Sequence, residues 1–266
     1  MKIGFIGGGN MGEAMLYAIL SKTVATAADI AVADVNPNRR QHLEREYGVR
    51  ITNSNIEAAG EADVVLMVVK PQNLADVMAG IAGRLKDNQL VVSIVAGAST
   101  ARLSQGLMHK AIVRAMPNTP AQIGQGVTVW TATAGVSGQQ KEQAAAILRA
   151  MGQEIYVADE NYLDMATAVS GSGPAYVFLF MEALITAAID IGLPPDTAKQ
   201  LVLETVAGSA AFAEKSGKEL SELKRMVTSP GGTTAAALEV LDEGRFSELI
   251  KKAVAAAHRR AGELGG

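Results

Sequence analysis

Cysteine is absent from the 266 residues of this chain, and its absence removes several kinds of chemistry. Disulfide bonds, thiolate nucleophiles and zinc sites with cysteine ligands are all excluded. A chain without cysteine also fits an intracellular location, where disulfides are rare. The segment Met1–Ile6 is too short and too rich in glycine for a secretory signal peptide. We therefore expect a soluble, cytoplasmic protein.

Blocks of positive charge are missing as well. The chain has 24 Lys and Arg against 27 Asp and Glu, without a basic cluster, so its sequence shows no electrostatic footprint for nucleic acid or an anionic membrane surface. The longest apolar stretch, residues 174–193, contains Glu182 and Asp190. Because two carboxylates are costly inside a bilayer, we expect a buried core helix here and no membrane partner.

The residues of common hydrolytic and metal sites are also absent. His42, His109 and His258 each lie in helical or polar surroundings without an evident partner. Neither an H-E-x-x-H motif nor a carboxylate cluster with metal spacing occurs, and Ser172 lacks the glycine that G-x-S-x-G requires at position 170. We expect no metal ion, and the chemistry must come from an organic cofactor combined with positioning.

The first part of the chain alternates between short β-branched runs and helical patterns. Strands are predicted at 2–6, 30–33, 49–51, 64–69, 90–95, 111–115, 126–130 and 154–157, and helices at 11–21, 37–47, 74–85, 100–105 and 139–151. Strands that are apolar throughout suit a sheet covered on both faces. The alternation predicts an α/β fold with a Rossmann-like, doubly wound parallel sheet and right-handed crossovers.

After residue 160 the strand pattern stops, and helical periodicity continues to the end. Several of these helices are apolar on more than one side, for example 175–191 and 198–213, and therefore need partners all around. A bundle of this size can scarcely bury them alone. We expect a dinucleotide-binding domain at 1–160 and a helical substrate and dimerisation domain at 161–266, which a second subunit completes.

Gly7-x-Gly9-x-x-Gly12 lies between a predicted strand and a predicted helix, as the dinucleotide-binding fingerprint requires. Gly7 allows the tight turn, Gly9 lets a pyrophosphate approach the backbone, and Gly12 lets the helix pack close to the strand. The positive end of the helix beginning near Asn10 attracts phosphate. The alternative is a tight turn without a ligand.

Asp34 ends the second predicted strand, where a carboxylate usually holds the ribose hydroxyls and favours NAD. Arg39 and Arg40 follow and either bind the 2′-phosphate of NADP or form a solvated helix surface. The residues alone leave the cofactor preference open.

Two further segments follow predicted strands at the edge where such sheets bind ligands. In residues 68–72, Pro71 suits the first turn of a helix. The small residues of 95–98 would let a nicotinamide ring pass close to the backbone. Taken singly, each segment is equally compatible with an ordinary strand-to-helix connection.

Three later segments present polar groups to a possible substrate. Prolines on both sides of Asn118 and Thr119 fix the backbone, and residues 170–175 precede the most apolar helix. In residues 227–234, a Ser-Pro-Gly-Gly turn leads into a helix near Thr233 and offers hydroxyls and free amides for a small carboxylate. Each segment also has a purely structural alternative. The segment around Asn118 would be a stiff connector, residues 170–175 would cap the helix that follows, and residues 227–234 would be a capped helix start.

Five motifs occur in an order that resembles the pyrroline-5-carboxylate reductase family. They are residues 7–11, 69–72, 116–120, 170–175 and 229–234, and the most specific signature of the family spans 223–241. The resemblance covers essentially the whole chain. It implies an oxidoreductase that transfers a hydride from NAD(P)H to the C=N bond of 1-pyrroline-5-carboxylate and gives L-proline, the last step of proline biosynthesis.

The resemblance also implies which residues bind each molecule. The substrate carboxylate would be held by Ser229, Gly231, Gly232, Thr233 and Thr234, and the Thr234 hydroxyl would lie near the ring nitrogen as the catalytic group. The cofactor would be held by Ile6, Gly7, Gly8, Gly9, Asn10, Met11, Gly12, Asp34, Asn55, Val68, Val69, Lys70, Pro71, Val95, Ala96 and Gly97. The usual cofactor of the family is NADPH (NADP), with NAD as the second candidate because many members carry a small polar residue in place of Asp34. The resemblance also implies an intertwined homodimer, the usual assembly of the family, which is often built into larger rings such as decamers.

Two other functions compete with this one. A β-hydroxyacid-dehydrogenase-like oxidoreductase needs a lysine at the end of G-x-G-x-x-x-K, but the seventh residue from Gly171 is Val177. A non-catalytic dinucleotide-binding module would need only the first domain, and residues 229–234 would then have no purpose.

Overall fold

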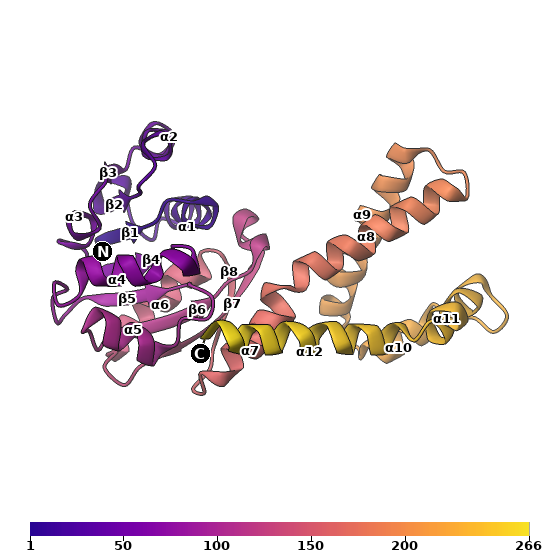
Figure 1. Ribbon diagram of the computed structural model, residues 1–266. Helices are drawn as coiled ribbons and strands as arrows, with labels where there is room; N and C mark the ends of the chain where they lie inside the picture. Colours follow the sequence, from indigo (N-terminus) through magenta and orange to yellow (C-terminus); the bar gives the residue numbers. More distant parts are fainter. Residues whose placement is uncertain (266) are drawn as a thin grey trace. The chain divides into compact units, whose positions relative to one another are not determined.

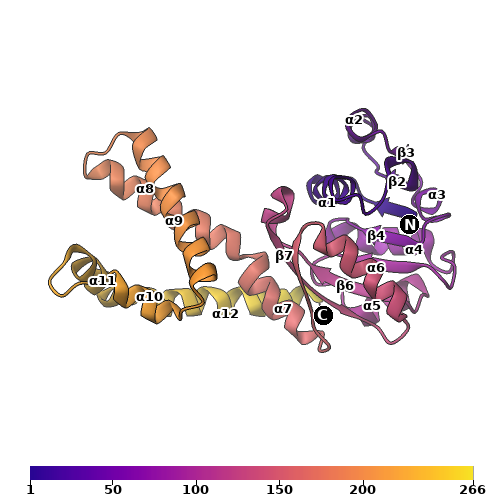
Figure 2. The ribbon, with the colours of Figure 1, turned by 180° about the vertical axis from the view of Figure 1, so that it is seen from behind.

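The computed structural model describes residues 1–265 and divides the chain into two compact units (Figures 1 and 2). Unit 1 comprises residues 1–172 together with the residues from Ala257 onward, and unit 2 comprises Gly173–Ala256. The sequence predicts the domain boundary after residue 160, whereas unit 1 continues to Ser172. Residues 161–172 therefore belong to the same unit as the sheet.

Unit 1 is built on an eight-stranded sheet within the described residues, in the order β3-β2-β1-β4-β5-β6-β7-β8. Each predicted strand is found, with bounds of β1 Ile3–Ile6, β2 Ile30–Ala33, β3 Arg50–Thr52, β4 Val64–Met67, β5 Leu90–Ser93, β6 Ile112–Met116, β7 Gly126–Ala132 and β8 Gly152–Tyr156. The order reverses between β1 and β4, both of which lie parallel to their neighbours. Ligands of open α/β sheets bind at such a reversal, beside the carboxyl ends of the strands.

One pair of strands departs from the predicted parallel arrangement. β7 runs antiparallel to β6, with Ala115 opposite Trp130, whereas β8 returns parallel to β7. The reason is the length of the connection: residues 117–125 form only the short 3₁₀ helix η3 (Thr119–Ile123), and a parallel crossover needs a dozen or more residues. The doubly wound fold class is confirmed, with a sheet that is mostly rather than wholly parallel.

The helices of unit 1 connect successive strands. They are α1 Asn10–Ser21, α2 Pro37–Tyr47, α3 Asn55–Ala59, α4 Leu74–Ile81, α5 Thr100–Leu107, α6 Gly138–Arg149 and α7 Asn161–Ala166, with 3₁₀ turns η1 Ala27–Asp29 and η2 Pro71–Asn73 and the π-helical turn η4 Thr167–Gly171. The sequence did not predict α3, whose five residues are too few to show a period. Local chemistry defines α2 clearly: the Asn36 side chain caps its start, and Gly48 ends it with a φ of +67°.

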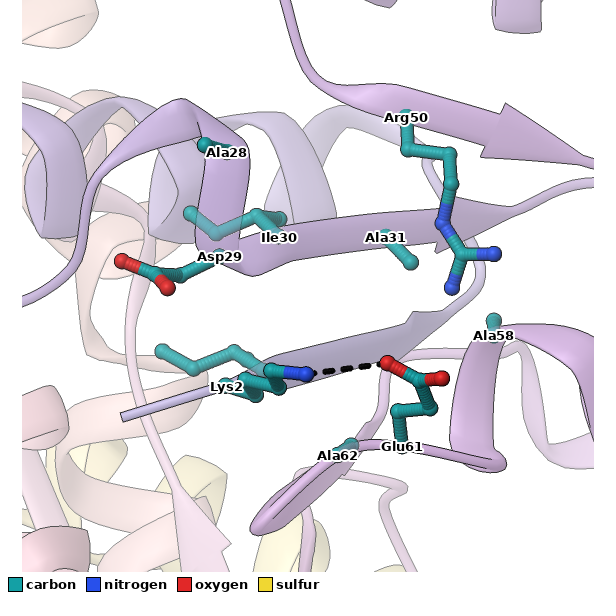
Figure 3. Close-up of a pocket in the computed structure, with 10 residues that line it drawn as sticks. Lys2, Ala28, Asp29, Ile30, Ala31, Arg50, Ala58, Glu61 and Ala62 are labelled. Carbon is teal, nitrogen blue, oxygen red and sulfur yellow. Dashed lines mark hydrogen bonds and ion pairs between the residues drawn. The ribbon is translucent and has the colours of Figure 1, made fainter.

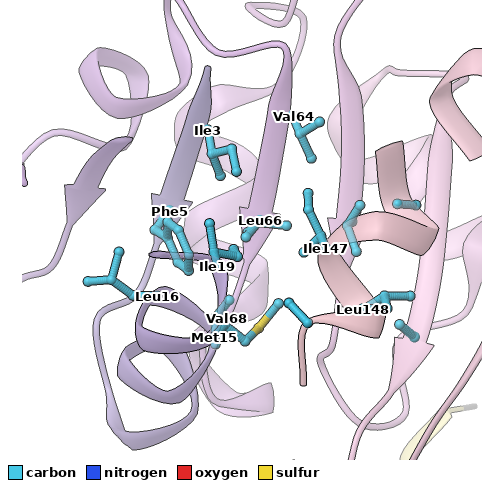
Figure 4. Close-up of a cluster of buried hydrophobic side chains, with 14 of the residues drawn as sticks. Ile3, Phe5, Met15, Leu16, Ile19, Val64, Leu66, Val68, Ile147 and Leu148 are labelled. Atoms are coloured by element: carbon cyan, nitrogen blue, oxygen red, sulfur yellow. The ribbon is translucent and has the colours of Figure 1, made fainter. Parts of the chain in front are cut away.

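Alternating strand residues fill two separate cores on the two faces of the sheet. Phe5 and Leu66 contribute to the larger core, where they lie with α1 and α6 side chains such as Met15 and Ile147 (Figure 4). Met67, next in sequence to Leu66, belongs to the other core, together with residues of α4 and α5. The continuous apolar runs of the central strands are therefore explained by burial on both faces.

Unit 2 is wholly helical in its described part. Its helices are α8 Gly173–Asp190, α9 Pro195–Ser216, α10 Leu220–Met226, α11 Thr233–Glu243 and most of α12 Phe246–Gly265. The expectation that residues 174–193 form a buried core helix is wrong for the single chain, because α8 has no buried residue in the described structure and Phe178 is 60% exposed. Among the described residues, one helical stretch is long and apolar enough to cross a membrane by length and composition alone. It is Asn161–Asp190, which includes α7, η4 and α8.

Candidate functional site

The glycine turn joins β1 to α1 at the carboxyl edge of the sheet, beside the end of β4. Gly7 has a φ of +101°, and a Cβ at this position would overlap the carbonyl oxygen of Val68. A Cβ on Gly12 would lie 2.5 Å from the carbonyl oxygen of Gly7. Backbone atoms occupy the space in both cases, so the fold itself requires glycine at these two positions.

Gly9 differs from Gly7 and Gly12 because the space beside it is open. Its φ of −63° suits any residue, and apart from its two chain neighbours no described residue has an atom within 4 Å of an added Cβ. Gly9 is the N-cap of α1, and no side chain in the described structure caps this helix end. Open space before a positive helix end is what a pyrophosphate needs, so the glycine turn fits a dinucleotide.

Charged side chains surround the end of β2, where Rossmann folds hold the adenosine ribose. Asp34 accepts hydrogen bonds from the amides of Gly8 and Asn36, each at 2.8 Å. Arg40 Nη1 donates to the Asp34 carbonyl oxygen at 2.6 Å, and Arg39 reaches back to carbonyl oxygens of the glycine turn. Both arginines therefore make fixed contacts at this edge, and neither is merely a solvated helix side chain.

The other predicted cofactor residues lie along the same edge, because β1 to β5 are mutually parallel. Asn55 begins α3 after β3, and exposed Lys70 follows β4. Residues 95–97 follow β5, but a Cβ on Gly97 would lie 2.5 Å from the carbonyl oxygen of Leu264 in α12. Gly97 therefore packs closely against α12, and the prediction that the small residues of 95–98 lie near a nicotinamide ring stays a prediction.

Two predicted substrate segments meet within unit 1. A Cβ on Gly171 would lie 2.9 Å from the terminal methyl group of Met116, so η4 passes close to the end of β6. Turns of π-helix are frequent at functional sites. The Oδ1 of Asn118 accepts the Val127 amide at 3.0 Å and holds the loop on β7, which favours the alternative of a stiff connector for this residue.

The predicted carboxylate site lies in unit 2, in the turn before α11. The helix starts at Thr233, as predicted, and Gly231 has a φ of +69°. A Cβ on Gly232 would overlap Ser229 Oγ, so the Ser229 hydroxyl lies directly beside the backbone of Gly232. In the described structure no side chain caps α11, and its first amides are free to bind an anion. The predicted cofactor residues belong to unit 1, and the predicted substrate residues to unit 2.

Sequence reasoning missed the role of Glu13 in the first turn of α1. Its carboxylate accepts hydrogen bonds from Arg39, His42 and Tyr47 of α2. Burial raises the pKa of Glu13, but these three hydrogen bonds outweigh burial and hold the pKa below its ordinary value. Burial and the hydrogen bond to Glu13 raise the pKa of Tyr47 to about 12. His42, for which the sequence showed no partner, is therefore paired.

A second network was also missed, around Arg114 in β6. The buried guanidinium contacts Glu160 at 2.9 Å and Asp164 at 2.6 Å. Glu160 accepts two further hydrogen bonds, from the amide and hydroxyl of Thr100 at 2.8 and 2.6 Å. Burial raises the pKa of Glu160, but the hydrogen bonds from Thr100 and Arg114 outweigh it, and the pKa lies below its ordinary value. The network joins β6 to the starts of α5 and α7.

We expect Glu160→Gln to lower the free energy of unfolding by about 1–3 kcal/mol at neutral pH, because Arg114 would keep its buried charge with one anion fewer. Folding lowers the Glu160 pKa, so the carboxylate stabilises the fold above the ordinary carboxyl range and loses this effect as pH falls through the folded pKa. The difference from the parent should therefore shrink below about pH 4. Urea unfolding at several pH values measures it, with exposed Glu142→Gln as control, and a difference independent of pH would contradict the argument.

A small hollow of about 90 Å³ lies at the opposite edge of the sheet, at the amino ends of β1 and β2 (Figure 3). Lys2 and Glu61 form an ion pair of 2.9 Å beside it, and Asp29 and Arg50 complete its charged lining. Ligands of this fold bind at the carboxyl ends of the strands, so we do not assign the cofactor to this hollow.

The described residues contain no group of three or more His, Asp or Glu that could hold a metal ion. His109 is buried, and its Nε2 lies 2.7 Å from the carbonyl oxygen of Gln89. A tetrahedral or octahedral site needs several such ligands together.

The fold and the glycine turn define a dinucleotide-dependent oxidoreductase, and the family comparisons agree. Residues 2–97 match the model described as NADP oxidoreductase coenzyme F420-dependent, and residues 160–264 match the model for pyrroline-5-carboxylate reductase dimerisation. The chain is 43% identical to a pyrroline-5-carboxylate reductase of Synechocystis sp. over 100% of this chain and 98% of that protein. It belongs to the pyrroline-5-carboxylate reductase family.

Other relatives cover the chain equally well. A pyrroline-5-carboxylate reductase of Pseudomonas aeruginosa is 42% identical over 99% of this chain and 96% of its own length. The solved structure of the reductase from Coxiella burnetii has a TM-score of 0.92 at 38% identity, covering 100% of this chain and 98% of that one. The Plasmodium falciparum enzyme, solved with NADP bound, has a TM-score of 0.91 at 31% identity and the same coverage. The similarity therefore extends over both units.

Proposed function

We propose that this chain reduces 1-pyrroline-5-carboxylate to L-proline with NADPH, in the last step of proline biosynthesis. The proposal rests on the combination of two open sites in a chain that resembles these reductases over its full length. The glycine turn is open beside Gly9, and in the described structure no side chain caps the helix that starts at Thr233. The first suits a pyrophosphate, and the second suits a small carboxylate. NADH is the second candidate for the reductant.

In the proposed mechanism, the glycine turn of residues 7–12 would hold the dinucleotide, whose nicotinamide would supply the hydride that reduces the protonated C=N bond of the substrate. Ser229, the glycines at 231 and 232 and the amides of Thr233 and Thr234 hold the carboxylate. The Thr234 hydroxyl, which forms no hydrogen bond with the described residues, orients the ring nitrogen. Because the protonated imine is already electrophilic, positioning in a dry site accounts for most of the catalysis, and a separate acid or base is unnecessary.

The assignment is tested directly by mixing the purified chain with pyrroline-5-carboxylate and NADPH, then NADH, while cofactor oxidation is followed by absorbance. Turnover with at least one cofactor, and proline as the product, is expected. No turnover with either cofactor would overturn the assignment.

The proposed assembly is a homodimer through unit 2, able to build larger rings, in the cytoplasm. The exposed apolar residues of α8 support this, since Phe178 and Leu179 are 60% and 66% exposed and Glu182 and Asp190 disfavour burial in lipid. The start of the apolar helical segment is also anchored in unit 1, where Leu163 is fully buried and Asp164 pairs with Arg114. A second copy is therefore a better cover for α8 than a membrane.

We expect Phe178→Glu to convert the dimer, or a larger assembly of dimers, to monomer in solution, because a carboxylate would be buried at the proposed interface. Light scattering after gel filtration measures the molar mass. The matched control is Lys199→Glu, an exposed charge reversal on α9. A parent chain that is monomeric would contradict the proposed assembly.

A further inference from the structure

Glu13 connects two elements of the proposed cofactor site, yet the mechanism gives it no role. It lies in the first turn of α1, directly after the glycine turn, and its side chain is 24% exposed. Its Oε1 contacts His42 Nε2 at 2.8 Å and accepts the Tyr47 hydroxyl at 3.0 Å, while Oε2 accepts from Arg39. All three partners lie on α2, so Glu13 fixes the start of α1 against α2.

Arg39 is the partner that matters for the cofactor. Its Nε donates to the carbonyl oxygen of Gly8, and its Nη2 donates to that of Gly9 at 3.3 Å and to Glu13. The side chain is 21% exposed, and Nη1 forms no hydrogen bond with any described residue. The guanidinium is therefore held over the glycine turn with one nitrogen left to receive an anion.

The formal charges of the acidic and basic side chains beside the end of β2 and the glycine turn sum to zero. Asp34 and Glu13 contribute two negative charges, and Arg39 and Arg40 contribute two positive charges. A 2′-phosphate adds negative charge to a region with no net positive charge, whereas the free ribose of NADH adds none. The ion pair with Glu13 is partly shielded from water, so its charge reduces the attraction of Arg39 for a phosphate.

We propose that Glu13 is a specificity-determining residue: by neutralising Arg39, it limits the preference for NADPH over NADH. The inference rests on the proposed function, since it assumes that a nicotinamide dinucleotide occupies the glycine turn. Asp34 acts in the same direction, but Glu13 acts through Arg39 and does not contact the ribose position itself.

The test is binding, measured by isothermal titration calorimetry without substrate. In Glu13→Gln, which keeps an oxygen for Arg39 but removes the charge, NADPH should bind about three- to tenfold more tightly, and NADH within about twofold of the parent. The fragments 2′,5′-ADP and 5′-ADP should show the same contrast. Glu61→Gln, whose carboxylate pairs with Lys2 at the opposite edge of the sheet, is the matched control and should change neither affinity.

A second variant separates this role from a structural one. Arg39→Met should weaken NADPH and spare NADH, and in the double variant Glu13→Gln/Arg39→Met the effect of the first change should vanish. Two results would overturn the proposed role of Glu13 while leaving the proposed function intact. One is an unchanged NADPH-to-NADH affinity ratio in Glu13→Gln, and the other is a gain in NADPH affinity from Glu13→Gln that is equally large when Arg39 is replaced by methionine. A parent chain that binds neither dinucleotide would instead overturn the proposed function.

Discussion

Replacing Thr234 with alanine is expected to lower the turnover number on the order of 100-fold while NADPH affinity stays at the parent value. Thr234 is the second residue of α11, is half-buried and has a hydroxyl without a partner among the described residues. A group that orients the ring nitrogen acts on the reacting bond, and its loss appears mainly in the turnover number. Steady-state kinetics and calorimetric titration with NADPH measure the two quantities.

The matched variant is Thr234→Ser, which keeps the hydroxyl and removes only a methyl group. It should retain most of the activity. Equal losses in Thr234→Ser and Thr234→Ala would assign the effect to packing of the helix start, and an unchanged rate in Thr234→Ala would remove Thr234 from the mechanism.

The second large effect is expected at Gly9. Gly9→Ala should weaken NADPH and NADH alike, by about tenfold or more, without changing the melting temperature. The added methyl group meets no described atom and needs no unusual backbone conformation, so the fold tolerates it. It does occupy the open space in which a pyrophosphate would approach the backbone.

Two other glycines provide the contrast for this experiment. Gly80→Ala, on the exposed side of α4, should leave both affinities unchanged. Gly7→Ala should lower the melting temperature as well as the affinities, because its methyl group would overlap the Val68 carbonyl oxygen. Unchanged binding in Gly9→Ala would place the dinucleotide elsewhere.

The strands were predictable because each is a local pattern. The run Val64–Val69, apolar at every position between Asp63 and Lys70, indicates a strand buried on both faces, and the structure buries all four residues of the strand Val64–Met67. The direction of β7 was not predictable in the same way, because strand pairing depends on a connection and a partner rather than on the strand itself. The helix predicted over 175–191 is found at Gly173–Asp190, but its predicted burial is wrong for the single chain, because burial depends on packing partners rather than on the helix itself.

In the candidate site, too, the local motifs were predictable from the sequence and the contacts between remote residues were not. The glycine turn and the turn before α11 were predictable because each is a short motif of consecutive residues, whose glycines indicate the backbone conformation. Glu13 and Arg39 are 26 positions apart, and Arg114 lies 46 positions from Glu160. No local spacing joins such pairs. Only the packing of α1 against α2, and of α7 against β6, brings their charges together.

The sequence by itself determined the Rossmann-like class, the position of the glycine turn and the helical nature of the second half, because hydrophobic periodicity and glycine spacing are local properties. The tertiary structure decided which glycines are required by the fold and which one leaves room for a ligand. It also decided how the charges at the end of β2 are paired. Both depend on distances between segments that are remote in the chain, and folding alone sets those distances.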